Sequence, residues 1–264
     1  MNLSSYSVVI PCYEPDERLI DAVESIINQT IKPVKIFIVD DCSKNNTVHK
    51  VIDSSIFYNS PLIEILVNSS NKGPGFSRNR GVKLVDSDFV AFLDCDDVWD
   101  EVKMQLQLKF LTQNKMNALG CYVNGESRFN YKQNIVKKIG FISQVFKHHV
   151  QPSTLVCNTD VIKDIGGFDE SYRFAEEGRL MFKLAMQKKL WLLTTPLVQY
   201  AGGSPLNKSQ GLSAHRWPMN VGNIYAVKSL IRDKDISVIL GLSCILWILT
   251  KYIYREIKVR FLHS

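Results

Sequence analysis

The sequence predicts an α/β fold with a mostly parallel central sheet and helices on both of its faces. Over the first hundred residues, short apolar runs alternate with segments whose apolar residues recur at helical spacing. Such alternation indicates parallel strands joined by right-handed crossovers. At 264 residues, 45% of them hydrophobic, the chain is long enough for one domain with an appendage.

The expected elements follow one another with clear boundaries. They are a strand at 7–10, an amphipathic helix at about 19–27, a strand at 34–39, a weaker helix at 47–54, a strand at 62–67, a helix at 77–85 and a strand at 89–93. Asp16 is placed to cap the first helix. From 101 to 206 the pattern is less regular, and residues 236–254 form an apolar helical tail with basic residues around it.

Three carboxylates gather where the strand at 89–93 ends, at Asp94, Asp96 and Asp97. Crowding three acids is costly unless cations or hydrogen-bond donors compensate. A hard divalent ion such as Mg²⁺ or Mn²⁺ takes oxygen ligands and often bridges to substrate phosphates. The alternative is a helix N-cap, which accounts for only one of the three.

Two further polar clusters follow strand ends, at 11–14 and at 40–41. Ligands of such sheets bind outside the carboxyl ends of the strands, so the three clusters should converge on one edge. The glycine-rich loop at 71–75 matches neither a dinucleotide fingerprint nor a P-loop, and by itself indicates a tight turn. Arg78 and Arg80 follow it, and two cations near a helix N-terminus suit phosphate.

A second acidic pair, Glu176-Glu177, opens a predicted helix after the turn at 166–170. Acids in a first helical turn are common because they complement the helix dipole. The pair therefore fits a structural role and a chemical role equally well.

The net charge of +6 is concentrated at the C-terminal end. From Arg216 to Ser264 there are eight Lys and Arg against three acids, which makes +5 and leaves +1 for the first 215 residues. A basic tail on a near-neutral body indicates contact with a negatively charged surface, a membrane or nucleic acid. Nucleic acid is disfavoured because the charge lies on an apolar tail without a base-stacking platform.

The apolar tail leaves three interpretations open. Residues 236–250 carry no charge and span about 22 Å as a helix, short of a roughly 30 Å hydrocarbon core. A helix on the membrane surface fits Trp247, Tyr252, Tyr254 and the basic flank. A core helix and a true span are the alternatives.

The cysteines and the N-terminus point to the cytoplasm. The six cysteines are far apart and form no C-x-x-C pair, which argues against a zinc site or a disulfide framework. We interpret them as small filler residues in a reducing compartment. The N-terminus shows no signal peptide, so the body should stay in the cytosol.

Together these motifs resemble the nucleotide-sugar glycosyltransferases of family 2, the inverting group with the GT-A fold. Order and spacing match over about residues 7 to 190. The matching segments are Ser7 to Tyr13, Ile38 to Ser43, Asn71 to Gly73 with Ser77 to Gly81, Leu93 to Trp99, and Gly166 to Glu170 followed by Glu176-Glu177.

The resemblance implies a donor site around the first strands. Pro11, Tyr13 and Glu14 would hold the base and ribose, with Tyr13 stacking on the base. Asp41 would read the base edge, and Arg78 would lie near the diphosphate.

The resemblance also implies a metal site and a base. Asp94, Asp96 and Asp97 fall on the D-x-D motif, with Asp96 the first choice as ligand of Mn²⁺ or Mg²⁺ and Asp97 the second. Glu177 takes the position of the general base, and Glu176 is the alternative.

Three residues depart from the family pattern. Glu177 is one methylene longer than the usual Asp, and Glu14 stands where Asn is usual. Arg179 replaces an Asp, and a cation there should lower the pKa of Glu177. On the acceptor side, residues 148–149 and 151–154 should lie nearby by their position in the chain, with both histidines exposed to solvent.

The implied activity is metal-dependent, inverting transfer from a nucleoside-diphosphate sugar, UDP by family habit, to a glycan or lipid-linked saccharide in surface polysaccharide synthesis. Residues 1–100 would form the nucleotide-sugar-binding half, 101–215 the acceptor-binding half of the same domain, and 216–264 the helical tail. We expect a cytoplasmic protein, peripheral on the inner face of the cell membrane, with membrane contact through 236–260 and no nucleic-acid partner.

Two other functions remain open. The departure at 176–179 permits a catalytically impaired scaffold or binding protein of the same fold. A sugar nucleotidyltransferase shares strand-end acids, but it should carry a glycine-rich basic loop after its first strand, and residues 11–14 are not one.

Overall fold

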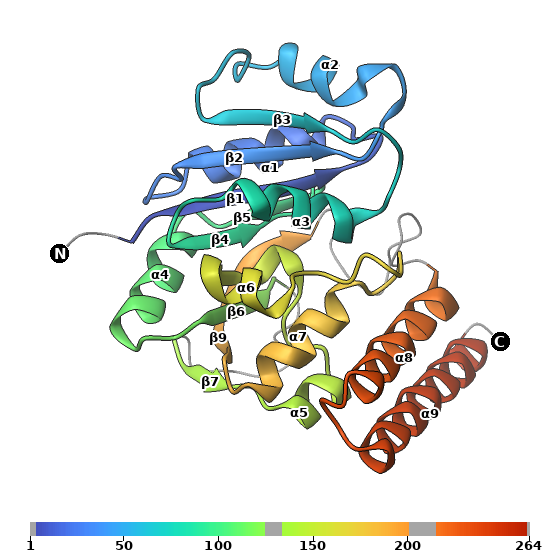
Figure 1. Cartoon of the computed structure of the whole chain (residues 1–264). Coiled ribbons are helices and arrows are strands. Elements are labelled where there is room, and N and C mark those ends of the chain that lie inside the picture. Colours follow the sequence, from blue (N-terminus) through green and yellow to red (C-terminus); the bar gives the residue numbers. More distant parts are fainter. Residues whose placement is uncertain (1–3, 125–133, 201–214, 263–264) are drawn as a thin grey trace.

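The computed structural model describes residues 4–124, 134–200 and 215–262. A curled central sheet runs through the molecule with helices on both faces, and two long C-terminal helices pack side by side at one end (Figure 1). The strands are β1 (Tyr6–Cys12), β2 (Lys35–Asp40), β3 (Ile63–Val67), β4 (Phe89–Phe92), β5 (Asp97–Trp99), β6 (Ala118–Val123), β7 (Val136–Lys138), β8 (Val156–Asn158) and β9 (Leu190–Tyr200).

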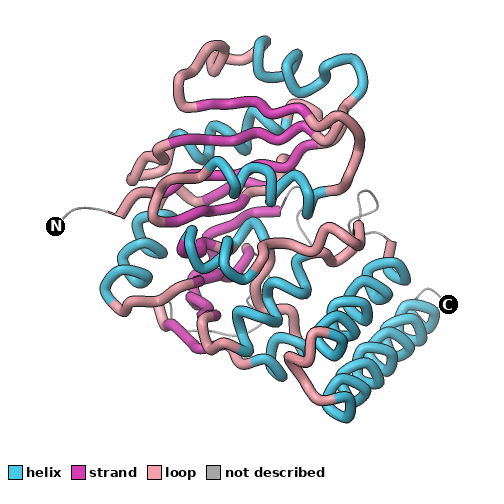
Figure 2. The backbone as a smooth tube through the Cα atoms, viewed as in Figure 1, coloured by secondary structure: helices cyan, strands magenta, loops and turns pink. Residues whose placement is uncertain are grey.

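The helices of the body are α1 (Arg18–Ile27), α2 (Thr47–Asp53), α3 (Pro74–Leu84), α4 (Lys103–Gln113), α5 (Phe141–Phe146), α6 (Thr159–Ile165) and α7 (Glu177–Met186), with short 3₁₀ turns at Lys44–Asn46 and Pro152–Thr154. The C-terminal pair is α8 (Arg216–Arg232) and α9 (Val238–Leu262). Helices alternate with strands from β1 to β4, but further along β5 follows β4 directly, β7 follows β6 and α7 follows α6; Figure 2 distinguishes the helices from the strands by colour.

The first half of the sheet has the predicted parallel order. The order is β3-β2-β1-β4-β8-β6-β9-β5, with β7 attached to β9. Strands β1 to β4 pair in parallel, while β8 and β5 run antiparallel to their described neighbours. The carboxyl ends of β1, β2 and β4 therefore meet at one edge, as the sequence predicts.

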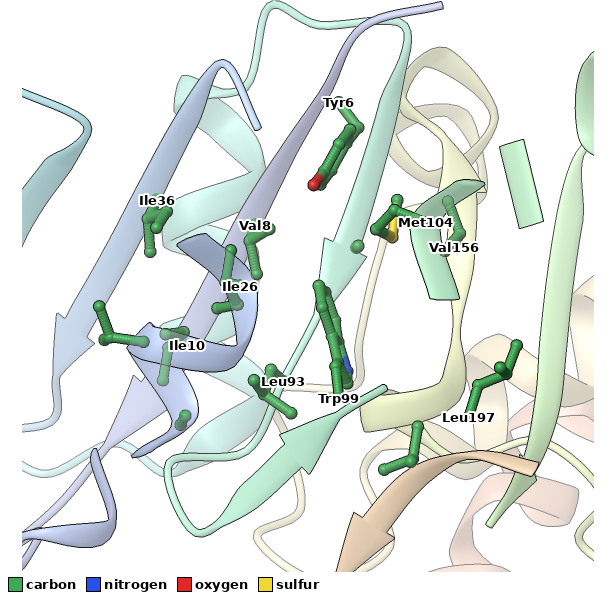
Figure 3. Close-up of a cluster of buried hydrophobic side chains, with 14 of the residues drawn as sticks. Tyr6, Val8, Ile10, Ile26, Ile36, Leu93, Trp99, Met104, Val156 and Leu197 are labelled. Atoms are coloured by element: carbon green, nitrogen blue, oxygen red, sulfur yellow. The ribbon is translucent and has the colours of Figure 1, made fainter. Parts of the chain in front are cut away.

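Alternation along β1 places its side chains into two cores. Tyr6, Val8 and Ile10 belong to the core under α1, whereas Val9 belongs to the core on the opposite face, because successive strand residues point to opposite sides. Figure 3 shows the first core, where Trp99 and Met104 pack beside the β1 side chains. Both faces of this strand are buried, which explains its unbroken apolar run.

Local signals fix the ends of the first helices. Helix α3 begins at Pro74, three residues before the predicted start, because proline suits a first helical turn. The expected cap, Asp16, lies one residue before the cap position of α1, which is Glu17 and makes no side-chain cap bond; the Asp16 carboxylate still accepts the backbone N–H of Arg18, the first helical residue, at 3.0 Å.

A third core joins the C-terminal pair to the body. It contains Val145 of α5, Phe182 of α7, Ala226, Val227 and Leu230 of α8, and Cys244 and Ile248 of α9. Helix α8 packs directly against α7, whose first residue is Glu177. The tail is thus attached to the helix that carries the second acidic pair.

Candidate active site

The ten side chains that the family resemblance assigns to the site line one cavity of about 600 Å³ at the carboxyl ends of β1, β2 and β4. They are Pro11, Tyr13, Glu14, Asp41, Arg78, Asp94, Asp96, Asp97, Glu176 and Glu177. They come from segments up to 166 residues apart (177 − 11), so the tertiary fold assembles the cavity. Arg80, expected beside Arg78 at a phosphate, does not line it and donates instead to the Val67 carbonyl oxygen at 2.6 Å.

Arg78 lies at the centre of this cavity wall. Its guanidinium, on α3, is 3% exposed and donates to Asp94 Oδ1 at 2.6 Å and to Glu176 Oε1. It also lies over the Phe168 ring, 5.1 Å from the centroid. A buried cation is tolerated when it is paired and hydrogen-bonded, so the two acids compensate Arg78 and hold three chain segments together.

Gly75 allows this arrangement by its small size. A Cβ at this position would lie 2.8 Å from the carbonyl oxygen of Asp169 and 2.9 Å from Cγ of Glu176. Any larger side chain would therefore push the first turn of α3 away from Glu176. The glycine-rich loop is thus more than a turn, because it sets the distance between Arg78 and its partner.

Glu177 is the first residue of α7, and its carboxyl has a raised pKa. Burial, with the adjacent charge of Glu176 second, raises the pKa of Glu177 to about 8, and Arg78 opposes the rise. The expectation for Arg179 was wrong. Its Nη2 pairs with Asp233 Oδ2 at 2.8 Å, because side chains two apart on a helix do not face each other.

The three aspartates of the D-x-D turn have different surroundings. Asp94 is paired with Arg78. Asp97 is buried, and its Oδ2 accepts the Ser153 hydroxyl at 2.6 Å, so it helps hold the turn. Asp96 is partly exposed, with Oδ2 3.9 Å from Nη1 of Arg18.

The donor set fits a divalent cation that shares a diphosphate. Within residues 4–124, 134–200 and 215–262, no three His, Cys, Asp or Glu side chains are grouped to hold a metal by themselves. Mg²⁺ is commonly bound by one or two carboxylates together with substrate phosphates and water. Asp96, supported by the neighbouring Asp97 or Asp94, can supply those carboxylates on the cavity wall.

The two acids expected at the nucleotide are both hydrogen-bonded to the protein. Asp41 accepts the Asn68 side-chain amide at 2.9 Å, the Lys72 backbone N–H at 2.8 Å and the Gly73 backbone N–H at 2.7 Å. Glu14 accepts the Lys44 backbone N–H at 2.7 Å. Each therefore orders a loop around the cavity.

Tyr13 presents an open aromatic surface beside them. Its side chain is 45% exposed and lines the cavity next to Pro11. An exposed ring at this place can stack on a planar base. Of the residues expected at the nucleotide, Tyr13 has the ring that is free to do so.

The residues expected on the acceptor side separate into some that line the cavity and some that do not. Gln151 and Pro152 line the cavity, and the Tyr200 hydroxyl donates to Gln151 Oε1. His148 and His149 do not line it, and they are half-buried rather than exposed. Burial lowers the pKa of His148 to about 4, and its ring lies 5.8 Å from that of Phe182.

Sequence reasoning missed several residues of the cavity wall, among them two cations, a histidine and a methionine. Arg173 comes from the loop before α7, His215 and Met219 come from the start of α8, and Arg18 opens α1. The sequence offered a reason to examine Arg18, because a cation in the first turn of a helix is unfavourable with the helix dipole and therefore needs another role. The other three have no local signature.

Comparison with known proteins places the chain among glycosyl transferases. The family model "Glycosyl transferase family 2" matches residues 7–193. Over 113 residues the chain is 29% identical to the UDP-Glc:alpha-D-GlcNAc-diphosphoundecaprenol beta-1,3-glucosyltransferase WfgD of Escherichia coli, covering 43% of each chain. The chain thus spans less than half the length of this relative.

Two solved structures share the fold. Residues 1–349 of S. aureus TarS, in complex with UDP-GlcNAc, superpose with a TM-score of 0.69 at 18% identity, covering 93% of this chain and 71% of TarS. A mannosyltransferase of Pyrobaculum calidifontis, in complex with GDP-Man and Mn²⁺, gives 0.66 at 16% identity, covering 94% and 70%. The predicted GT-A fold is confirmed, including the apolar C-terminal helix.

Proposed function

The chain belongs to glycosyl transferase family 2, and from that premise we propose that it performs metal-dependent, inverting transfer from a nucleoside-diphosphate sugar to a lipid-linked saccharide. One observation carries the proposal. A cavity of about 600 Å³ brings an open aromatic ring, partly exposed acids, a buried arginine and a carboxyl of raised pKa to one sheet edge. The ring can stack on a base, the arginine and the acids with their metal can bind a diphosphate, and the carboxyl of raised pKa can accept one proton.

Glu177 is the proposed general base. A carboxylate whose pKa lies near the working pH accepts a proton more readily than an ordinary glutamate. The acceptor hydroxyl gives its proton to Glu177 while its oxygen bonds to the anomeric carbon and the bond to the β-phosphate breaks. Glu176 is the less suitable base because its Oε1 already accepts the Arg78 guanidinium.

The leaving diphosphate needs positive charge, and the cavity offers two sources. Arg78 supplies a fixed cation, and its ion pair with Asp94 holds the start of the D-x-D turn in place. Mn²⁺ or Mg²⁺ bound at Asp96, with Asp97 beside it, would add Lewis-acid neutralisation of the β-phosphate. The Mn²⁺ in the mannosyltransferase complex supports this cofactor class.

The donor and acceptor are proposed from the relatives. WfgD is named for a UDP-glucose donor and a diphosphoundecaprenol-linked acceptor, and TarS was solved with UDP-GlcNAc. We therefore favour UDP as the nucleotide. A lipid-linked acceptor places the reaction in surface polysaccharide synthesis, at the cytoplasmic face of the cell membrane.

Thermal melting with UDP, GDP and dTDP, each with and without Mn²⁺, tests the donor site. A ligand at a hundred times its dissociation constant stabilises by about 2.7 kcal/mol, enough to raise Tm by several degrees. The expected result is a rise that needs both one nucleotide and the metal. No rise with any nucleotide would overturn the donor assignment.

Glu177→Gln tests the base. We expect at least about a hundredfold loss of turnover with an unchanged nucleotide-dependent rise in Tm. Near-normal transfer would move the base elsewhere. Analysis of the product anomer by NMR spectroscopy tests inversion separately.

A further inference from the structure

Arg18 is the first residue of α1, and its side chain lines the catalytic cavity. A cation at this end of a helix is unfavourable with the helix dipole, so Arg18 does not stabilise α1 in that way. The side chain is 50% exposed and does not belong to the buried face of α1, which runs from Leu19 to Ile26. An arginine at this position is therefore explained by its charge and not by its packing.

The carboxylate of Asp16 holds one edge of the Arg18 guanidinium. Nε donates to Oδ1 at 2.8 Å, and Nη2 lies 2.8 Å from Oδ2. Two parallel bonds of this kind fix the direction of a guanidinium as well as its position. Nε and Nη2 share one edge of the group, so the remaining nitrogen, Nη1, lies on the side away from Asp16. Within residues 4–124, 134–200 and 215–262, no hydrogen bond uses Nη1.

The other side of the guanidinium faces the D-x-D turn. Nη1 lies 3.9 Å from Oδ2 of Asp96, the first choice among the metal ligands. That distance is too long for a hydrogen bond, but the two charges still attract each other. The pKa of Arg18 is raised, first by its hydrogen bond to Asp16 and also by the charge of Asp96. The contact follows from the topology, because β1 and β4 pair in parallel and the loops that leave their carboxyl ends lie side by side.

The cavity wall is strongly acidic. Eight carboxylates line it together with three arginines and one histidine. The carboxylates are Glu14, Asp16, Asp41, Asp94, Asp96, Asp97, Glu176 and Glu177, and the arginines are Arg18, Arg78 and Arg173. Arg78 already compensates Asp94 and Glu176 inside the protein. A diphosphate is itself an anion, so it needs further positive charge where it meets the D-x-D turn. Arg18 supplies a cation at that place.

We propose that Arg18 is a further donor-binding residue, whose Nη1 binds the diphosphate of the nucleotide sugar beside Asp96 and whose charge weakens metal binding at Asp96. This inference rests on the proposed function and adds a residue to its donor site. A guanidinium held on one edge by a carboxylate is well suited to a phosphate oxygen on its other side. The same positive charge attracts the diphosphate and repels a divalent cation, so it acts with opposite sign on the two ligands of the site.

The size of both effects follows from distance and exposure. Arg18 and Asp96 are partly exposed, so water weakens the interactions of their charges. In a water-like medium, a unit charge about 6 Å from a divalent ion changes the dissociation constant of that ion about tenfold. The diphosphate accepts one charge-assisted hydrogen bond from the same nitrogen, and we expect an effect of about fivefold on nucleotide affinity.

Arg18→Gln in the full chain tests both effects. Binding of Mn²⁺ alone is measured from the electron paramagnetic resonance signal of the free ion. Binding of UDP is measured by titration calorimetry at a Mn²⁺ concentration that saturates each protein. We expect the variant to bind Mn²⁺ about tenfold more tightly than the wild type and UDP about fivefold more weakly. Arg18→Lys keeps the charge and should return both affinities towards the wild-type values.

Lys32→Gln is the matched control, because it removes one positive charge from an exposed residue beyond the other end of α1. Lys32 does not line the cavity. The ten residues of α1 span about 15 Å, more than the Debye length of about 8 Å at physiological salt, so neither affinity should change. A purely structural role of Arg18 is distinguished by sign. Loosening of α1 would lower Tm and weaken both ligands, whereas loss of a cation moves the two affinities in opposite directions.

The outcomes separate this inference from the proposed donor site. If the wild type binds both ligands and Arg18→Gln binds them equally well, or binds both more weakly, the inference is overturned and the donor assignment stands. Tighter Mn²⁺ with unchanged UDP would overturn the contact with the diphosphate. If UDP does not bind to the wild type but Arg18→Gln still tightens Mn²⁺, the donor assignment fails and the effect of Arg18 on the metal is upheld. Failure of the wild type to bind either ligand overturns both.

Discussion

Glu176→Gln should shift the pH dependence of transfer without abolishing transfer. Burial and the charge of Glu176 raise the pKa of Glu177 from 4.5 to about 8, so the wild-type rate should rise with pH and reach half its maximum near pH 8. The variant removes the neighbouring charge and frees Arg78 from one partner. Both changes favour the ionised form of Glu177.

The expected shift in the half-maximal pH follows from which of the two causes, burial or the charge of Glu176, raises the pKa of Glu177 more. Burial is the larger one, so neutralising Glu176 should lower the half-maximal pH by about one unit and leave it near 7. At pH 6.5 the variant would then retain more of its maximal rate than the wild type does. Loss of a partner of buried Arg78 should also lower Tm, so rates are compared well below the melting temperature.

The assay is kcat/KM for release of the nucleoside diphosphate between pH 5.5 and pH 9. If Glu176→Gln abolishes turnover at every pH while Glu177→Gln does not, Glu176 is the base and the reasoning is refuted. An unshifted profile would show that the charge of Glu176 does not act on Glu177.

Stability offers a second readout of the same carboxyl. An acid whose folded-state pKa is raised binds its proton more tightly in the folded state, so stability falls as pH rises between about 4.5 and 8. Glu177→Gln mimics the protonated form. Its Tm should therefore match the wild type near pH 4.5 and exceed it near pH 8, and an equal Tm at both values would contradict the raised pKa.

The remaining predictions concern three parts of the site. Asp96→Ala should lower turnover at least about a hundredfold and abolish the metal-dependent part of the nucleotide-induced rise in Tm; a retained metal effect would exclude Asp96 as ligand. Glu14→Ala should cost about 1 kcal/mol of stability, read as a Tm lower by a few degrees, with nucleotide affinity nearly unchanged, because it removes the acceptor of the Lys44 backbone N–H. Gly222→Ala should lower the free energy of unfolding by about 1–3 kcal/mol and slow transfer, because the added Cβ would overlap the carbonyl oxygen of Phe174, in the segment before Glu177. Gly140→Ala is the control: its Cβ would enter open space, so melting and activity assays should show no change.

The first half of the fold was predictable because its signals are local. A buried parallel strand reads as an apolar run, and a surface helix reads as a 3.6-residue period. The expected strand at 34–39 is β2 (Lys35–Asp40), and the expected helix at 47–54 is α2 (Thr47–Asp53). The mixed half, with β6, β8 and β9, left no such pattern because its partners are distant in the sequence.

The candidate site likewise has a part that the sequence predicted and a part that it did not. Strand-end acids and Arg78 were visible in the sequence because parallel strands deliver their carboxyl ends to one edge. The role of each residue within the cluster was not visible in the sequence, since the pairing of Arg78 with Glu176 depends on the close approach of α3 at Gly75. Arg179 was misjudged for the same reason: its partner Asp233 lies 54 residues away.

The sequence by itself determined the family, the α/β fold and the set of residues at the sheet edge, because motifs and apolar periodicity depend on residues that are close together in the sequence. Only the tertiary structure decided which glutamate is ion-paired and which has a raised pKa, because burial and charge proximity arise when distant segments pack. It also decided which face of α9 is attached and which is open, since α8 and α5 occupy one side of a helix that is apolar on both.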